Sequence, residues 1–145
     1  MVYCTDSDML VYLPKNVRDV LLAEDVLEEG QEGETEYDRI VSEKIQLATD
    51  YVTFVLLMRK DYLTEVPNDI KMTTAMLSAL YVIEYYIHLA PESMGIDYNT
   101  PNYKSVISNK INEMKNHIDR VYIDNNFADI EKSYFELFVP KDKEE

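Results

Sequence analysis

Several residue types are scarce in this chain of 145 residues, and each scarcity excludes a class of protein. Tryptophan is absent, and the 3 glycines and 5 prolines are too few for the tight turns of an all-β sandwich. The single cysteine, Cys4, cannot form an internal disulfide or a cysteine-based metal site, and a reducing compartment is expected. No apolar run is long enough to cross a bilayer, and the first residues lack the pattern of a signal peptide.

The chain is strongly acidic and rich in hydrophobic residues. The chain has 28 acidic residues against 14 basic ones, a formal net charge of -14, so it should repel nucleic-acid phosphates and anionic membranes. Hydrophobic residues make up 46% and tyrosines number 12, which is typical of a folded domain with many amphipathic aromatic side chains. The acidity indicates either simple solubility or a surface that does not hold DNA passing nearby.

Apolar residues recur at helical spacing in two long stretches that are separated by a corner ending at Pro67. Residues 38–60 predict one helix and residues 69–90 predict the next. Because the connection is short, the two helices should pack antiparallel. The first is apolar nearly all round in its C-terminal half, so we expect it at the centre. Five residues should be buried between them: Val52, Val55, Leu77, Leu80 and Ile83.

Shorter signals complete the expected domain. Thr5 and Asp8 are spaced for a reciprocal helix cap, and Thr100 followed by Pro101 predicts the start of a later helix with one buried face. The fold class is therefore mainly α, a small helical bundle in residues 1–123 built on the two long antiparallel helices.

The end of the chain has a different composition. Residues 133–140 are dense in aromatic and other side chains that favour extended backbone. We expect residues 124–145 to form a short extended C-terminal arm, in which residues 127–140 either dock on a neighbouring protein or fold back onto the chain's own helices. The candidate partner-binding residues are Tyr134, Phe135, Leu137, Phe138 and Val139.

An acidic segment precedes the first long helix. Residues 24–38 contain acidic side chains, no basic ones and two of the glycines, which predicts an exposed loop. It is either a solvated connector or an acidic lip that faces a partner or a channel. The candidate acidic surface comprises Glu28, Glu29, Glu32, Glu34 and Glu36.

Catalytic patterns are mostly missing. No glycine-rich phosphate loop and no nucleophile arrangement are present. Glu84 and His88 are four residues apart, as are Glu113 and His117, so each pair would share a helical face. Di-iron bundles space glutamate and histidine by three and need further glutamates, whereas a spacing of four is common in surface pairs. We therefore predict no catalytic residue, no metal and no cofactor.

Three motifs in residues 1–90 resemble a known family. They are Tyr3-x-Thr5-x-x-Asp8-Met9, then Leu47-Ala48-x-Asp50-Tyr51-Val52, then Asp61-Tyr62-Leu63 followed by Pro67 and Ile70-Lys71. Their order and spacing resemble those of the adaptor, or head-completion, proteins of tailed bacteriophages, which connect head and tail.

The resemblance implies a structural virion protein, made in the host cytoplasm and located in the neck between capsid and tail. It implies a homo-oligomeric ring, twelve-fold in the family, that contacts the portal and tail or neck proteins while DNA passes without specific binding. Two alternatives come from other classes. One is a small cytoplasmic helical regulator that binds one protein partner, and the other is a metal-dependent enzyme.

Overall fold

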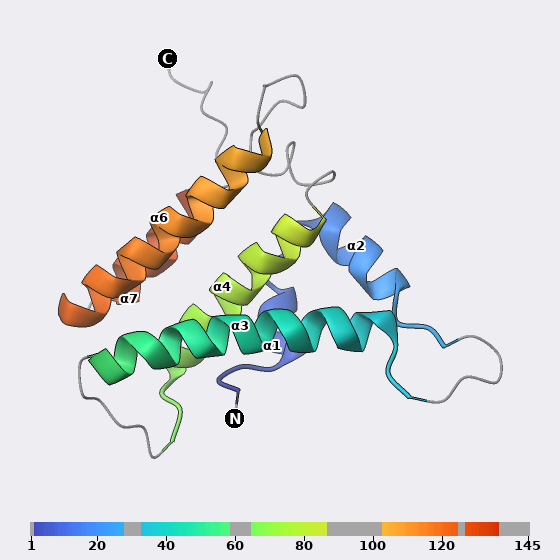
Figure 1. The fold of residues 1–145 in the computed structure, drawn as a ribbon, viewed down its shortest axis with the longest axis horizontal. Helices are drawn as coiled ribbons and strands as arrows, with labels where there is room; N and C mark the ends of the chain where they lie inside the picture. The colour runs from blue at the N-terminus through green and yellow to red at the C-terminus, as the bar shows by residue number, and fades with distance from the viewer. Residues whose placement is uncertain (1, 28–32, 59–64, 87–102, 125–126, 137–145) are drawn as a thin grey trace.

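The structure, a computed structural model, describes residues 2–27, 33–58, 65–86, 103–124 and 127–136. Within these ranges every regular element is a helix, so the predicted mainly α fold is confirmed. Figure 1 shows α3 (Glu36–Met58) along the long axis of the view and α4 (Asn68–Tyr85) inclined across it. Helices α6 (Tyr103–Asp124) and α7 (Phe127–Glu136) lie side by side beyond α4.

Two short helices, α1 (Asp6–Leu10) and α2 (Lys15–Ala23), open the fold. The predicted cap of α1 is confirmed: the Asp8 amide donates to Thr5 Oγ1 at 3.3 Å, and the Thr5 amide donates to Asp8 Oδ2 at 2.9 Å. Two amide groups that the first turn would leave without partners are satisfied in this way. Helix α1 packs against α3 and α4, and α2 packs against α3.

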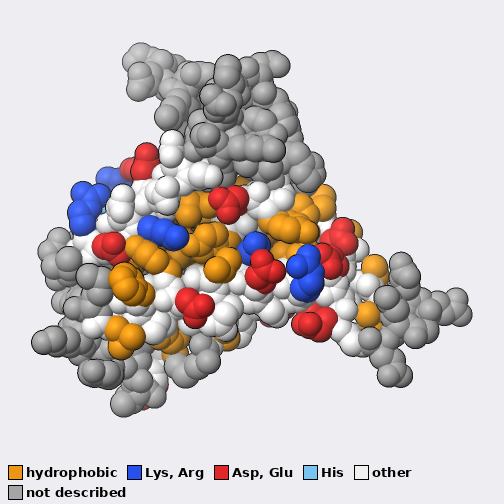
Figure 2. All heavy atoms as spheres, viewed as in Figure 1, with side chains coloured by type: hydrophobic (Ala, Val, Ile, Leu, Met, Phe, Trp, Pro, Cys, Tyr) orange, Lys and Arg blue, Asp and Glu red, His pale blue; other side chains and the backbone are white. Residues whose placement is uncertain are grey.

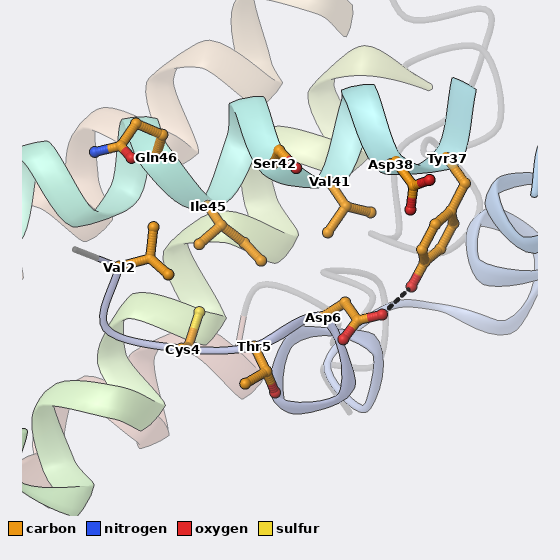
Figure 3. Close-up of a pocket in the computed structure, with 10 residues that line it drawn as sticks. All are labelled: Val2, Cys4, Thr5, Asp6, Tyr37, Asp38, Val41, Ser42, Ile45 and Gln46. Carbon is orange, nitrogen blue, oxygen red and sulfur yellow. Dashed lines mark hydrogen bonds between the residues drawn. The ribbon is translucent and has the colours of Figure 1, made fainter. Parts of the chain in front are cut away.

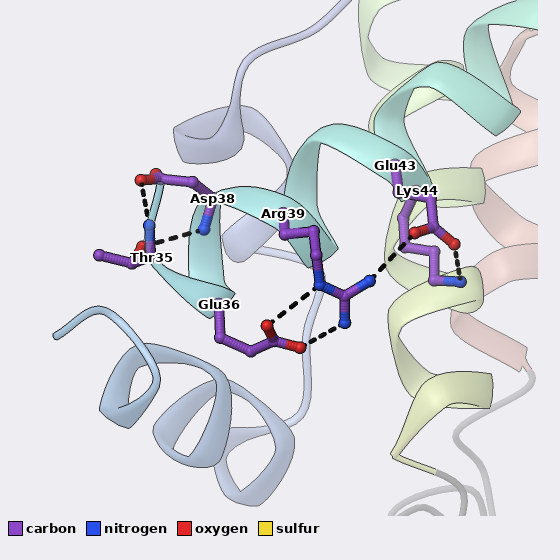
Figure 4. A network of polar contacts seen from close by, with 6 residues as sticks. All are labelled: Thr35, Glu36, Asp38, Arg39, Glu43 and Lys44. Carbon is purple, nitrogen blue, oxygen red and sulfur yellow. Dashed lines mark hydrogen bonds and ion pairs between the residues drawn. The ribbon is translucent and has the colours of Figure 1, made fainter. Parts of the chain in front are cut away.

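Helix α3 begins at Glu36, two residues earlier than the sequence predicted. The cause is a second reciprocal cap, in which the Thr35 amide donates to Asp38 Oδ2 and the Asp38 amide donates to Thr35 Oγ1, both at 3.1 Å (Figure 4). Threonine caps a helix well, and a carboxylate three residues later completes the exchange. The expected acidic loop therefore becomes helical by residue 36.

The two long helices pack antiparallel, as predicted. Near the start of α3, the Lys44 ammonium lies 5.5 Å from the centroid of the Tyr85 ring near the end of α4. Further along α3, the Tyr51 ring and the Tyr81 ring of α4 share the Lys115 ammonium at 5.0 and 5.5 Å. From the first contact to the second, the residue number rises on α3, from Lys44 to Tyr51, and falls on α4, from Tyr85 to Tyr81, as in an antiparallel pair. The five residues predicted to lie in the core are all buried.

Helix α4 is the centre of the fold, and the expectation that α3 would be central is wrong. Helix α4 packs against α1, α3, α6 and α7, and its buried residues lie on all sides of it. Two of its buried hydroxyls are satisfied within the helix, because Thr74 donates to the Ile70 carbonyl at 2.8 Å and Ser78 donates to the Thr74 carbonyl at 2.7 Å. The buried Thr73 hydroxyl has no hydrogen-bond partner among the described residues.

The expected extended conformation at the end of the chain is wrong for residues 127–136, which form α7. Ile130 and Tyr134 are four residues apart, share one helical face and are fully buried. The Tyr134 hydroxyl donates to the Tyr12 carbonyl, and the two tyrosine rings meet edge to face at 5.4 Å. Burial of this face outweighs the extended preference of aromatic residues, which depends strongly on context. Residues 137–140 of the expected arm lie outside the described residues.

Helix α6 presents the buried row that the sequence predicted, here Ile111, Met114 and Ile118. Its predicted cap, Thr100 with Pro101, lies outside the described residues. None of the helices in the described ranges combines the length and the apolar character that a membrane crossing requires.

Candidate functional site

Helix α3 carries a row of apolar side chains that the core leaves open. Leu47, Phe54 and Leu57 are 45%, 59% and 53% exposed. Spacings of seven and ten residues place them on one side of the helix, opposite Val52 and Val55. Figure 2 shows hydrophobic side chains along the face that α3 crosses, interspersed with charged ones. The apolar stripe of this helix is therefore wider than its contacts within the described chain, which leave these three side chains uncovered.

Three side chains, Tyr51 of α3, Tyr81 of α4 and Lys115 of α6, form a belt across these helices. The Tyr51 hydroxyl donates to the Lys115 carbonyl at 2.9 Å and to Asp119 Oδ1 at 2.7 Å. Burial, followed by the hydrogen bond to the Asp119 carboxylate, raises the pKa of the Tyr51 phenol. The Lys115 ammonium lies over the Tyr51 and Tyr81 rings, where a cation is attracted to the π face. The belt links α3, α4 and α6.

The acidic surface expected from the sequence is only partly described. Glu28, Glu29 and Glu32 lie outside the described residues, whereas Glu34 and Glu36 are exposed. The Arg39 guanidinium binds the Glu36 carboxylate with two nitrogens, and these hydrogen bonds lower the pKa of that carboxyl.

The network around Arg39 continues along α3. Arg39 reaches Glu43 at 3.5 Å, and the Lys44 ammonium lies 3.3 Å from the same carboxylate (Figure 4). Opposite charges alternate here, so the surface at the start of α3 is a mixed one. The Glu36 carboxylate belongs to this network and contributes little unpaired charge to an acidic lip.

A cavity of about 360 Å³ lies between residues 2–6 and the first half of α3. Figure 3 shows that α3 and the N-terminal segment line opposite sides of it. Apolar side chains line one part of the cavity, and the carboxylates of Asp6 and Asp38 with the phenol of Tyr37 line the other. The lining residues are Val2, Cys4, Thr5, Asp6, Tyr37, Asp38, Val41, Ser42, Ile45 and Gln46.

The Cys4 thiol is expected to be unreactive in the folded protein. The side chain is buried, its Sγ lies 3.9 Å from Ser78 Oγ, and burial raises its pKa to about 11. At pH 8 only about 0.1% would be thiolate, the reactive form. Titration with a thiol-specific disulfide reagent at pH 8 should give less than about a tenth of the rate measured in urea. Equal rates in both solvents would show that Cys4 is exposed.

The candidate partner-binding residues at the end of the chain are separated by the structure. Tyr134 is fully buried against the chain's own core, whereas Phe135 is 52% exposed and lies 6.3 Å from the Tyr12 ring. Of the candidate residues that the structure describes, Phe135 is therefore the one whose side chain is open to a partner. Leu137, Phe138 and Val139 lie outside the described residues.

The two glutamate–histidine pairs receive no support as a metal centre. His88 lies outside the described residues, and Glu113 is exposed beside the half-buried His117. In the described part of the chain, no group of three or more histidine, cysteine, aspartate or glutamate side chains is placed to hold a metal ion. The absence of enzymatic activity and of a cofactor stays a prediction, which elemental analysis and activity assays on purified protein would check.

Comparison with protein-family models, with curated protein sequences and with solved structures finds no match to this chain.

Proposed function

We propose that this chain is a structural virion protein of a tailed bacteriophage, located in the neck between capsid and tail. Copies of it form a ring that connects the portal to the tail and lines the DNA exit channel. The observation that carries the proposal is the open apolar row of α3, formed by Leu47, Phe54 and Leu57. Large apolar side chains gathered on one side of a well-packed helix are typical of a protein interface.

A second apolar patch lies near the other end of α3. Leu22, Val26 and Leu27, at and after the end of α2, are 44%, 72% and 45% exposed. This stretch is tied to the start of α3, because Thr35 donates to Asp25 at 2.9 Å and the Tyr37 amide donates to the Glu24 carbonyl at 3.3 Å.

The two patches suit a ring because they are different and well separated. From Glu36 to Phe54 the rise along α3 is about 27 Å at 1.5 Å per residue. Contact between unlike patches of successive copies is head-to-tail, and such contacts close into rings when the rotation per copy allows it. The net charge of -14 lets DNA pass through such a ring without adhering, since like charges repel.

Light scattering with size-exclusion chromatography tests the proposal, on the protein alone and mixed with purified portal. We expect assemblies of more than two copies, and we expect Phe54→Glu and Val26→Glu each to abolish them. Each substitution places a charge in one of the two patches. Mixing these two variants should restore dimers only, because one intact patch of each kind remains and the chain of contacts cannot continue.

Val11→Glu is the matched control, because Val11 is 69% exposed and lies outside both patches. It should assemble as the unchanged protein does. A protein that stays monomeric at all concentrations, alone and with portal, would contradict the ring. It would instead favour the small helical regulator that binds a single partner.

A further inference from the structure

The cavity between residues 2–6 and α3 is divided between apolar and acidic lining. Val2 and Cys4 from the N-terminal segment face Val41 and Ile45 of α3, whereas Asp6, Tyr37 and Asp38 lie together at one end (Figure 3). A volume of about 360 Å³ is within the range of small binding sites, roughly 300–1,000 Å³. Such a lining matches a ligand that has an aliphatic stem and a polar tip.

The two carboxylates at the acidic end have no cationic partner in the described part of the chain. Asp6 accepts from the Tyr37 hydroxyl and from the Ser7 amide, both at 2.9 Å, and Asp38 accepts from the Thr35 amide at 3.1 Å. An ionised carboxylate offers about four acceptor sites, so each retains capacity for further donors. The acidic end is therefore built to accept hydrogen bonds.

The electrostatic balance at this end is negative. Helices α1 and α3 begin here, and each helix start contributes at most about half a positive charge. Against this total of about one stand the carboxylates of Asp6, Asp25 and Asp38. Burial, then the hydrogen bond to Asp6 and the charges of all three, raise the pKa of the Tyr37 phenol.

We infer that this cavity receives a lysine or arginine side chain of a partner protein. The aliphatic stem lies against Val2, Val41 and Ile45, and the cation lies at the end formed by Asp6 and Asp38. Long basic side chains bury their stems in this way while the charged head keeps polar contacts. The rim residues Ser42 and Gln46 are exposed, so the backbone of a partner protein has room outside the cavity.

Nuclear magnetic resonance titration of the full chain tests this assignment with two matched probes. They are Nα-acetyl-lysine methylamide and Nα-acetyl-norleucine methylamide, which share a stem and differ in the charge. The lysine compound should shift the amide signals of Tyr37, Val41 and Ser42. It should bind about two- to fivefold more tightly than the norleucine compound, because Asp6 and Asp38 are exposed and an ion pair at an exposed carboxylate is modest.

Variants of the lining make the test specific. Replacing both exposed carboxylates, Asp6→Asn with Asp38→Asn, should weaken binding of the lysine compound about two- to fivefold, to the level of the norleucine compound. Glu113→Gln, which removes an exposed acid on α6, should leave it unchanged. Ser42→Tyr fills the rim without altering charge and should abolish the signal shifts, so the proposal stays testable if the double variant does not fold.

Four results would overturn the inference. The first is equal binding of the two probes, and the second is unchanged binding in Ser42→Tyr. The third is tighter binding of 1,4-diaminobutane than of the lysine compound, which would assign the cavity to a free amine. The fourth is a shift of the same amide signals when residues 137–145 are deleted, which would make the chain's own lysines the occupants.

Discussion

Val52→Asp is expected to leave the chain without a cooperative thermal transition. Val52 is fully buried on the side of α3 that faces the core. Keeping an aspartate neutral at pH 7 costs about 4 kcal/mol, because its pKa must rise by about three units. Lost burial of the valine adds roughly 1.5–3 kcal/mol. The sum is comparable with the whole stability of a small domain, about 5–15 kcal/mol. Circular dichroism during heating measures the outcome.

Leu47→Asp is the matched control for this prediction. Leu47 lies on the same helix but in the open row, so an aspartate there remains solvated. We expect a change below about 1 kcal/mol and a melting temperature within a few degrees of the unchanged protein. A Val52→Asp protein that melts as cooperatively as Leu47→Asp would contradict the placement of α3.

Truncation after Asn126 should destabilise the domain strongly. It removes α7 and with it the buried side chains of Ile130 and Tyr134, each worth roughly 1.5–3 kcal/mol. It also exposes the faces of α4 and α6 that α7 covers. We expect the melting temperature to fall by roughly 10 °C or more. The measurement is thermal unfolding of the truncated and full chains at equal concentration.

A chain ending at Glu136 separates α7 from the residues beyond it. It keeps Ile130 and Tyr134 and should therefore lose far less stability than the shorter chain. If truncation after Asn126 left the melting temperature unchanged, α7 would not belong to the core. The whole segment from residue 127 would then be available as an arm for a partner.

Periodic apolar residues predicted the two long helices and their core, because burial repeats at the helical period. Local capping was also readable at Thr5, where threonine and aspartate have the required spacing. The same spacing at Thr35 and Asp38 could have placed the start of α3, but the surrounding acidic residues favoured a loop. The capping pair Thr35 and Asp38 favours a helix and the acidic composition favours a loop, and the structure has the capped helix.

Which helix is central could not be predicted, because α3 and α4 are both apolar. The difference lies in burial: both helices meet four others, but α4 is buried on all sides, whereas α3 keeps Phe54 and Leu57 exposed. Helix α7 was missed for a related reason, since the pair Ile130 and Tyr134 is helical in spacing but sits beside aromatics that favour strands. Contact with Tyr12, far away in sequence, decided the outcome.

The cavity was not predictable from any motif. Its lining joins residues 2–6 to residues 37–46, and neither stretch has the composition of a binding site alone. The open row of α3 was partly visible, because the apolar stripe was wider than one contact needs. The sequence could not say which half would be buried.

The proposed ring rests on two exposed apolar patches of a helical domain centred on α4 and on a net charge of -14. The mass of the complex formed with purified portal rings, measured by light scattering, tests this most directly. If the proposed ring forms on the portal, one species will be heavier than the portal ring by a fixed multiple of this chain's mass. Separate elution of unchanged portal and monomeric protein would contradict it.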